Sequence, residues 1–488
     1  MIYYDGMLDS FFRKFWLVFG QLKKSIEAKE IILFLIFILT NFLFNRLLLQ
    51  GVVIFLYIIA LYLVNKNLTK SLWLVLISTI FFSLGRYFPF KFSTPFSKDV
   101  EAYKVFGVCF TDAIYILLLY WLKRSAHPIK MRISWADLII GFIVFLAVVS
   151  SYFSPHSDIA WFNLLQLLKL IALFYLSRIL FWKKDYAKMT MIFMLIYLFL
   201  NSVLMILQKI HGGLLGLIVE NYFMKYGNYA QDSPGLFRPG GMSWDSNFSA
   251  AYLSMGFVFL VTLLVCNSRF LNKKIIPFLL CLFAVAIIIS ASRGSWIAII
   301  LISFLIVAIN LFQSKKKIDQ YLKPKIIVPI LLFVVFFGGF IVQRFYQFTS
   351  EMGQSTINTR LIHLKLGFFL SLNNPIGTGP DTFQYELMST FKPKEYLFDS
   401  TPAHMMLGEL LGDFGIFGAI AFISLFYLVL RKSLFYKKKN HQLQLAERSG
   451  FFYMIITYLF LAQIYPLLFS FQISAIFWIV LGALYEED

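Results

Sequence analysis

The chain has 488 residues, of which 59% are apolar and only 14% are charged. Soluble domains are about 45–50% apolar and about 25% charged, so the composition excludes an ordinary soluble globular protein. The formal net charge of +19 would suit a nucleic acid partner, but the basic residues gather in short segments between apolar runs. Anionic lipid and the insertion bias of membrane proteins explain that pattern. We therefore expect membrane lipids as partners and no nucleic acid.

The N-terminal segment, residues 1–30, is basic and amphipathic. Its aromatic and basic side chains between Phe11 and Lys24 predict a helix that lies on the membrane surface. It contains no apolar core followed by a small-residue cleavage site, so we expect no cleaved signal peptide.

Apolar runs of about 15 to 20 residues, a length suited to helices that cross a bilayer, recur from Ile31 to Tyr485. They predict an all-α, polytopic membrane protein with about 12 to 14 spans. Fourteen spans are predicted near residues 31–45, 51–65, 71–85, 105–122, 135–151, 159–182, 189–209, 247–266, 275–291, 295–312, 326–343, 404–430, 450–465 and 469–485.

The distribution of basic residues predicts the orientation of these spans. With the N-terminus inside, the inside segments contain 28 Lys and Arg residues and the outside segments contain 14. Basic residues favour the cytoplasmic side, so we predict a multi-pass protein of a bacterial cytoplasmic membrane with both termini in the cytoplasm. If residues 31–65 formed one tilted helix, the N-terminus would change sides but the later loops would not.

The predicted organisation has six consecutive parts. They are an interfacial N-terminus at 1–30, an N-terminal transmembrane bundle at 31–209, an extracytoplasmic loop at 210–246, transmembrane helices with a Ser-Arg-Gly hairpin at 247–343, a large, partly helical extracytoplasmic loop at 344–403, and C-terminal transmembrane helices at 404–488. Long loops inside compact folds are usually functional, so these two loops and the hairpin are the expected places for a functional site.

Arg293 lies in Ser292-Arg293-Gly294, at the outward turn of a predicted membrane hairpin. The preference of basic residues for the cytoplasm does not explain an arginine on that side, although a snorkelling arginine remains an alternative. A charge at the membrane edge is costly unless it is used. The small neighbours would let the backbone approach a ligand, and the start of the next helix favours an anion.

Two more arginines are predicted on the same side. Arg360 lies in a segment with apolar residues at helical spacing, and its guanidinium suits phosphate oxygens, although a solvated helix face is an equal alternative. Arg238 lies in a turn-rich loop that leads to Asp245 and Asn247. Helix capping is the favoured role for those two residues, and Asn247 is also a candidate substrate-binding residue.

His404 opens a predicted span, and Glu409 and Asp413 follow it. The titration range of histidine suits proton abstraction from a hydroxyl, and a packed interfacial histidine is the alternative. Glu409 and Asp413 are candidate substrate-binding residues. The sequence contains no HExxH, paired DxD, P-loop or GxSxG motif, so we expect no metal, nucleotide or other cofactor.

Asp112 and Lys169 are polar residues within apolar runs. Each could line a cavity, or the two could pair inside the bundle. A proton-coupled transporter would usually show more such groups.

Four features in this order resemble the bacterial O-antigen ligase and Wzy-type polysaccharide polymerase superfamily, over roughly residues 230–425. They are Arg238-Pro239-Gly240 before a span, Ser292-Arg293-Gly294 in a hairpin, Arg360 upstream of Pro375-Ile376-Gly377-Thr378-Gly379, and His404 in a span that continues with Gly412-Asp413-Phe414-Gly415. Met405 departs from the ligase pattern, in which asparagine often follows the histidine.

The resemblance implies a GT-C-like fold and a metal-independent, inverting glycosyltransferase. Such enzymes take a glycan from an undecaprenyl-diphosphate carrier at the outer leaflet. In that scheme Arg293 and Arg360 hold the diphosphate, and His404 orients or deprotonates the acceptor hydroxyl. Flippase or chain-length proteins are the protein partners that the resemblance implies.

Polymerase and ligase activities both fit this superfamily. The chain is rich in Phe, Ile and Lys, which suggests a low-GC Gram-positive source without lipid A. That favours a polymerase for a capsular polysaccharide or a wall polymer of the teichuronic acid type. A ligase, a lipid-linked oligosaccharide flippase and a non-catalytic scaffold remain alternatives.

Overall fold

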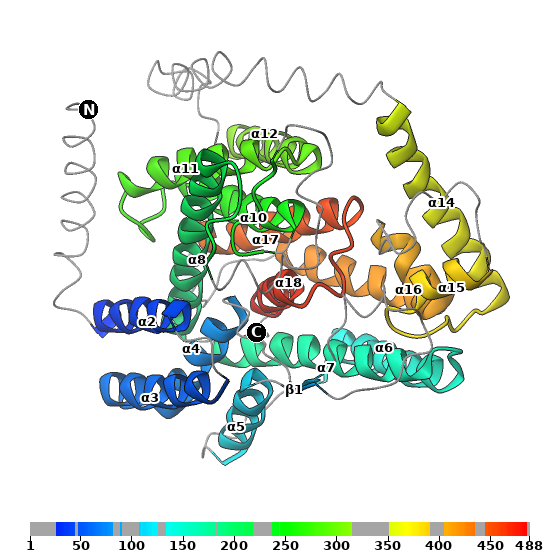
Figure 1. The fold of residues 1–488 in the computed structure, drawn as a ribbon, viewed down its shortest axis with the longest axis horizontal. Helices are drawn as coiled ribbons and strands as arrows, with labels where there is room; N and C mark the ends of the chain where they lie inside the picture. The colour runs from blue at the N-terminus through cyan, green and yellow to red at the C-terminus, as the bar shows by residue number, and fades with distance from the viewer. Residues whose placement is uncertain are drawn as a thin grey trace.

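The computed structural model describes residues 26–43, 47–81, 88–89, 107–108, 110–124, 133–181, 183–217, 237–243, 245–314, 351–390, 405–434 and 445–485. The predicted surface helix before residue 26 and the predicted span at 326–343 lie outside these residues. The described part is almost entirely helical (Figure 1), which confirms the all-α prediction.

The N-terminal half contains seven described helices. They are α2 (Ile26–Leu43), α3 (Leu47–Asn65), α4 (Leu68–Phe81), α5 (Phe110–Arg124), α6 (Trp135–Phe153), α7 (Ser157–Leu180) and α8 (Lys184–His211). Helices α2 and α3 pack against each other, so the apolar stretch at 31–65 forms two helices rather than one tilted helix.

The C-terminal half contributes eight helices to the described structure. They are α10 (Ser246–Val265), α11 (Ile275–Ile289), α12 (Arg293–Ser314), α14 (Glu351–Asn373), α15 (Phe383–Thr390), α16 (Met406–Leu434), α17 (Leu445–Ala462) and α18 (Phe471–Leu484). Helices α14 and α15 fall within the long loop at 344–403, which is therefore partly helical, as predicted.

Six helices of the described chain are long and apolar enough to cross a membrane, and four shorter apolar helices accompany them. This composition confirms a polytopic helical membrane protein. One predicted span starts too early. Residues 105–109 were assigned to a span, but strand β2 (Gly107–Val108) pairs antiparallel with β1 (Phe88–Pro89), and α5 starts only at Phe110. Apolar composition alone does not distinguish a short strand from the first turn of a helix.

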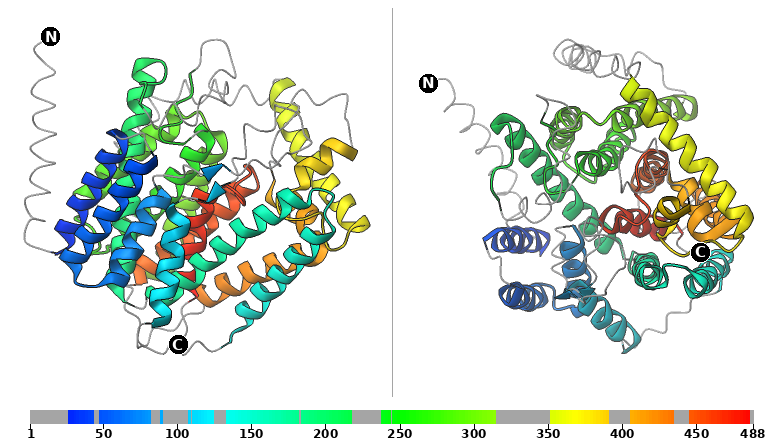
Figure 2. Two further views of the ribbon diagram at one scale, coloured as in Figure 1. Left: turned by 60° about the horizontal axis from the view of Figure 1, so that its bottom comes forward. Right: turned by 45° about the vertical axis from the view of Figure 1, so that its right-hand side comes forward.

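Helix α18 lies at the centre of the bundle (Figures 1 and 2). It packs against α7, α17, α4, α10 and α16, and its side chains from Ile473 to Leu484 are buried. The turn that precedes it is buried as well, with Tyr465, Leu467 and Leu468 all inaccessible to solvent or nearly so. The turn between α17 and α18 therefore reaches the interior of the molecule.

Two of the ion pairs in the N-terminal half connect α7 to its neighbours. Lys169 Nζ on α7 lies 2.9 Å from Asp112 Oδ1 on α5, so these residues pair inside the bundle, which was one of the two alternatives for them. Arg178 Nη1 lies 2.7 Å from Asp137 Oδ1 on α6. Each pair compensates charges that would be costly to leave alone between helices.

Helices α14 and α16 form the most extensive helix pair in the described structure, side by side at one edge of the bundle (Figure 1). Glycines make their close approach possible. A Cβ on Gly367 would lie 2.4 Å from the carbonyl oxygen of Gly408, and a Cβ on Gly408 would lie 2.9 Å from that of His363. The crossing fixes the position of the first half of α14, which carries Arg360.

Candidate functional site

The turn between α11 and α12 places Arg293 at the first position of α12. Ala291 adopts a left-handed conformation with φ of 56°, which reverses the chain within three residues. Trp296 Nε1 donates to the carbonyl of Ile287 across the turn at 3.0 Å. The predicted hairpin is therefore present, and its geometry is fixed by hydrogen bonds rather than by solvent.

Arg238 lies beside this turn and is held by two neutral acceptors. Its Nε donates to the carbonyl of Ser290 at 2.9 Å, and its Nη2 donates to Asn247 Oδ1 at 2.8 Å. Asp245 caps α10 by accepting from the amide of Asn247. The capping role predicted for this pair is therefore present, and Asn247 also orients Arg238.

The loop that carries Arg238 is itself fixed to α8. Gln208 Oε1 accepts from the amide of Gly241 at 2.8 Å, and its Nε2 donates to the carbonyl of the same glycine at 3.2 Å. Asn201 Oδ1 accepts from the amide of Met242 at 2.7 Å. A Cβ on Gly241 would meet Asn201 Oδ1 at 2.2 Å, so only glycine fits there. Buried amide pairs of this kind hold a loop rigidly.

Tyr465, in the turn between α17 and α18, lies among the three arginines. Its side chain is buried, and its hydroxyl is 2.6 Å from Ser292 Oγ. The charges of Arg238 and Arg360 both act on this hydroxyl. Arg293 interacts electrostatically with Tyr465, Arg360 and Arg238. Four separate segments of the chain therefore bring three guanidinium groups within electrostatic range of one phenol.

Burial changes the ionisation of two groups in this cluster. It raises the pKa of Tyr465, against the opposing effect of the cations Arg238 and Arg360. Burial also lowers the pKa of Arg360, but arginine starts so high that it stays charged at neutral pH. The phenol is therefore neutral and the arginines are cations, which gives a buried region of positive potential.

Helix α14 presents His363 one turn after Arg360. The His363 side chain is buried, and burial together with the Arg360 charge lowers its pKa to about 4. Arg360 Nε is buried and makes no hydrogen bond within the described residues. A buried, charged N–H group without a hydrogen bond is costly, and an anion or a water molecule would satisfy it.

The two glycine-rich motifs of the second half of the chain contact each other. Helix α16 is kinked at Gly415, where φ is 65°, and the loop before α15 docks there. Thr378 N donates to the carbonyl of Gly412 at 3.0 Å, and Gly379 N donates to that of Asp413 at 2.9 Å. A Cβ on Gly415 would lie 2.0 Å from the carbonyl oxygen of Pro375. The loop and the kink therefore require each other.

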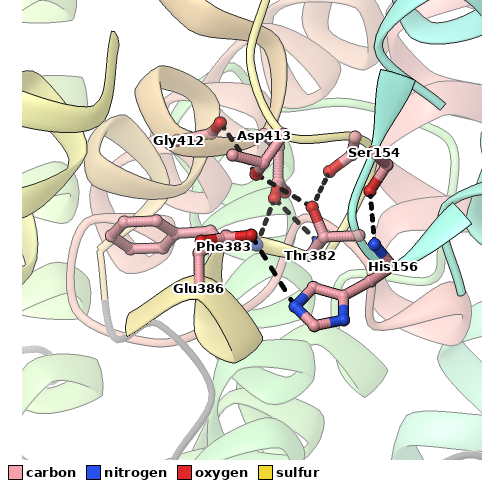
Figure 3. A network of polar contacts seen from close by, with 9 residues as sticks. Ser154, His156, Thr382, Phe383, Glu386, Gly412 and Asp413 are labelled. Carbon is pink, nitrogen blue, oxygen red and sulfur yellow. Dashed lines mark hydrogen bonds and ion pairs between the residues drawn. The ribbon is translucent and has the colours of Figure 1, made fainter. Parts of the chain in front are cut away.

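Asp413 anchors this loop, as Figure 3 shows. Its Oδ1 accepts from the amides of Thr382 and Phe383 at 2.9 and 2.8 Å, and its Oδ2 accepts from the amide of Asp381 at 2.8 Å. These amides belong to the start of α15, so the carboxylate caps that helix. Asp413 is fully buried, and both of its oxygens are engaged with the backbone.

A second contact attaches α15 to the bundle. His156, in the turn between α6 and α7, lies 3.7 Å from Glu386 on α15 and close to the ring of Tyr385 (Figure 3). Burial lowers the pKa of His156, and the Glu386 charge partly opposes that shift. The segment after Arg360 is therefore held at both α16 and the α6–α7 turn.

Comparison with protein families matches the second half of the chain in part. Residues 278–423 match the family described as O-antigen ligase (Wzy_C). Over these residues, here named the O-antigen ligase domain, the chain is similar to that family. Comparison with curated proteins gives no match. The domain contains Arg293, Arg360, Glu409 and Asp413, and Arg238 precedes it. Members of the family are glycosyltransferase-like enzymes, ligases or polymerases, that act on lipid-linked oligosaccharides.

The O-antigen ligase domain also includes the predicted site residue His404, five residues before Glu409. His404 lies outside the described residues, which resume at Met405. Glu409 is buried in the first turn of α16 and donates its amide to the carbonyl of Met405 at 3.0 Å. Its charge acts on Tyr458 of α17.

Sequence reasoning missed Tyr465, Ser292 as its partner, and His363. Ser292 was noted only as a small neighbour of Arg293, expected to let a ligand approach. In the structure the small residues of this turn accommodate Tyr465 instead. No motif marks Tyr465 in the apolar C-terminal sequence, and only its place in the turn before the central helix α18 brings it to the arginines.

We predict that Gly294→Ala reduces activity by displacing Tyr465. The new Cβ would lie 2.6 Å from the Tyr465 hydroxyl and 3.1 Å from two carbons of Ile464, and overpacking of this kind costs about 1–3 kcal/mol. We expect polymer formation to fall at least about fivefold, because a cost of about 1 kcal/mol at the site corresponds to that factor in rate. Gly141→Ala is the matched control, since a Cβ there has open space. Equal activity of the two variants would contradict the prediction.

We also predict that stability falls between pH 6.5 and pH 4 because of His363. Its pKa is about 4 in the folded protein, against 6.5 for the ordinary side chain. As the pH falls through this window, the unfolded state takes up a proton that the folded state does not, so up to about 3 kcal/mol of stability is lost. Thermal unfolding at pH 7 and pH 5 in detergent measures the effect. His363→Gln should show a smaller drop; an unchanged pH dependence would refute the prediction.

Proposed function

We propose that the protein is a membrane glycosyltransferase that polymerises undecaprenyl-diphosphate-linked oligosaccharide repeats at the outer leaflet of the cytoplasmic membrane. The observation that carries the proposal is the convergence of Arg238, Arg293 and Arg360 around Tyr465. Guanidinium groups bind phosphate oxygens through paired hydrogen bonds, and three partly buried ones together have the charge to hold a diphosphate.

In the proposed reaction, the oxygen of an acceptor hydroxyl attacks the anomeric carbon of the donor from the side opposite the diphosphate. The bond from that carbon to the diphosphate oxygen breaks with inversion, and its electron pair leaves with the lipid diphosphate. Arg293 and Arg360 stabilise the negative charge as it develops. His404 takes the hydroxyl proton. No step in this scheme requires a metal.

The remaining site residues support these groups. Arg238 contacts the diphosphate and is oriented by Asn247, which hydrogen-bonds its guanidinium. Glu409, one turn into α16, binds the acceptor sugar. Asp413 positions the start of α15, because its carboxylate is fully used by backbone amides.

Extension of a purified diphosphate-linked repeat by the purified protein tests this function. We expect a ladder of polymer that persists in EDTA. Loss of activity with EDTA would overturn the metal-free mechanism. A flippase would be favoured by two results together. The purified protein would form no product, and cells that lack the protein would retain the repeats on the cytoplasmic leaflet.

A ligase is the second candidate, because the matched family is described as O-antigen ligase. The donor chemistry is the same, and only the acceptor differs. Offering the protein a lipid-linked repeat as the only acceptor distinguishes the two functions. A polymerase makes chains under that condition, whereas a ligase leaves the repeat unextended.

A further inference from the structure

The hydroxyl groups of Tyr465 and Ser292 lie within the arginine cluster, 2.6 Å apart. We propose that these two residues form a positioning pair that holds the guanidinium groups of Arg238, Arg293 and Arg360 in place for the departing diphosphate. The proposal rests on the proposed function of the site. It assigns a role to a residue beyond the O-antigen ligase domain, which ends at residue 423.

The direction of the hydrogen bonds indicates how the pair works. Ser292 Oγ donates to Ser295 Oγ at 3.0 Å, so its single proton is used there. The Tyr465 hydroxyl then donates its own proton to Ser292. The phenol oxygen keeps its lone pairs as acceptors, and the charges of Arg238 and Arg360 act on this side chain.

A neutral acceptor at this point has a physical advantage over a carboxylate. Three cations in one buried region repel each other, and an oxygen dipole directed at them reduces that cost. A carboxylate would neutralise the cluster and compete with the substrate. The phenol oxygen orients the arginines while leaving their charge for an anion. Arg238 is held in the same manner, by a carbonyl and an amide oxygen.

The pair is also fixed in space. Tyr465 N donates to the carbonyl of Leu461 at 2.9 Å, at the end of α17. On the opposite side, Gly294 has no room for a Cβ because the phenol lies against it. The phenol therefore cannot move without moving the first turn of α12, which carries Arg293. Preorganisation of this kind favours charge that develops in the transition state over charge already present in the ground state.

Tyr465→Phe and Ser292→Ala test the pair, with turnover of the purified lipid-linked repeat as the readout. We expect each variant to lower kcat about tenfold and to change KM less than twofold. The double variant should be no slower than either single variant, because both remove the same interaction. Multiplication of the two effects to about 100-fold, or turnover within twofold of the wild type for Tyr465→Phe, would overturn the proposal.

A matched control separates this role from a general need for buried tyrosine–serine contacts. Tyr57 on α3 is buried, and its hydroxyl lies 3.2 Å from Ser78 Oγ on α4. Tyr57→Phe and Ser78→Ala should keep wild-type kcat. A tenfold loss in these variants as well would assign the effect to packing of the bundle and overturn the proposal.

Inorganic diphosphate distinguishes failure of this proposal from failure of the proposed function. It carries the charge that the leaving group acquires, and its binding to the purified full-length protein is measurable by calorimetry without any turnover. We expect wild-type protein to bind it about tenfold more tightly than Tyr465→Phe does. If the wild type fails to extend the lipid-linked repeat but shows this difference, only the proposed function fails. Equal affinities, or no binding by the wild type, overturn the positioning pair.

Discussion

Arg293→Ala is expected to lower the rate of polymer formation at least about 100-fold, the usual cost of removing one donor that stabilises developing charge. Arg293 begins α12 and interacts electrostatically with both Arg360 and Arg238. Its loss removes one of three partly buried cations from the site. In cells, chain length should collapse to single repeats while the lipid-linked repeat accumulates outside. The length distribution of the extracted polymer measures the effect.

Arg293→Lys refines this prediction. Lysine keeps the charge but lacks the planar fork of donors that matches phosphate oxygens, so we expect an intermediate loss. Arg269→Ala is the control, because Arg269 is an exposed arginine in the short segment between α10 and α11. If Arg293→Ala made polymer of normal length, the assignment of this residue to the diphosphate would be wrong.

Asp413→Ala is expected to destabilise the protein by about 3–5 kcal/mol, because a buried network then loses its only acceptor for several donors. Three backbone amides donate to the Asp413 carboxylate, and alanine leaves them in the interior without those bonds. The start of α15 and the loop docked at the α16 kink should loosen together. Thermal unfolding of the purified protein and the yield of polymer measure the effect.

Asp413→Asn tests whether the residue positions the loop or binds substrate, as the sequence led us to expect. The asparagine oxygen can replace Oδ1 for Thr382 and Phe383, but its NH₂ group would face the amide of Asp381. We therefore expect about 1–2 kcal/mol of destabilisation, the cost of one lost hydrogen bond and one unsatisfied donor, with an unchanged KM. A raised KM with wild-type stability would instead assign Asp413 to substrate binding.

The fold class was predictable because apolar runs of bilayer length leave few alternatives to helices. The helical segment around Arg360 was also predictable, from its apolar spacing. The boundaries were less so. The span placed at 105–122 begins at Phe110, after a two-residue strand. Hydropathy identifies where apolar side chains occur. It does not determine whether the first residues of an apolar run pair as a strand or begin a helix.

The three arginines were predictable because a guanidinium at the edge of an apolar run is costly and therefore conspicuous. Their supporting residues were not. Tyr465 is an ordinary aromatic residue in an apolar sequence, and its role depends on α18 being the central helix. Asp413 looked like a candidate ligand because a carboxylate in an apolar run is also conspicuous. Only the positions of the Asp381, Thr382 and Phe383 amides identify it as a helix cap.

The relation between the two glycine-rich motifs could not be inferred from either motif alone. More than 30 residues of sequence separate the Pro375–Gly379 loop from the Gly412–Gly415 kink. Amides of the loop donate to carbonyls of the kink, and the close approach of the two backbones leaves no room for a side chain at Gly415. Their docking holds the end of α14, the helix that carries Arg360, against α16. The motifs therefore act on the candidate site by fixing geometry rather than by contacting substrate.

The central claim is that Arg238, Arg293 and Arg360 together hold the diphosphate of a lipid-linked donor. Electron cryomicroscopy of the protein with bound undecaprenyl diphosphate tests it most directly. We predict density for the diphosphate within hydrogen-bonding distance of all three guanidinium groups, next to Tyr465. Diphosphate density at the basic segments on the opposite side of the membrane, with the three arginines unoccupied, would contradict the account.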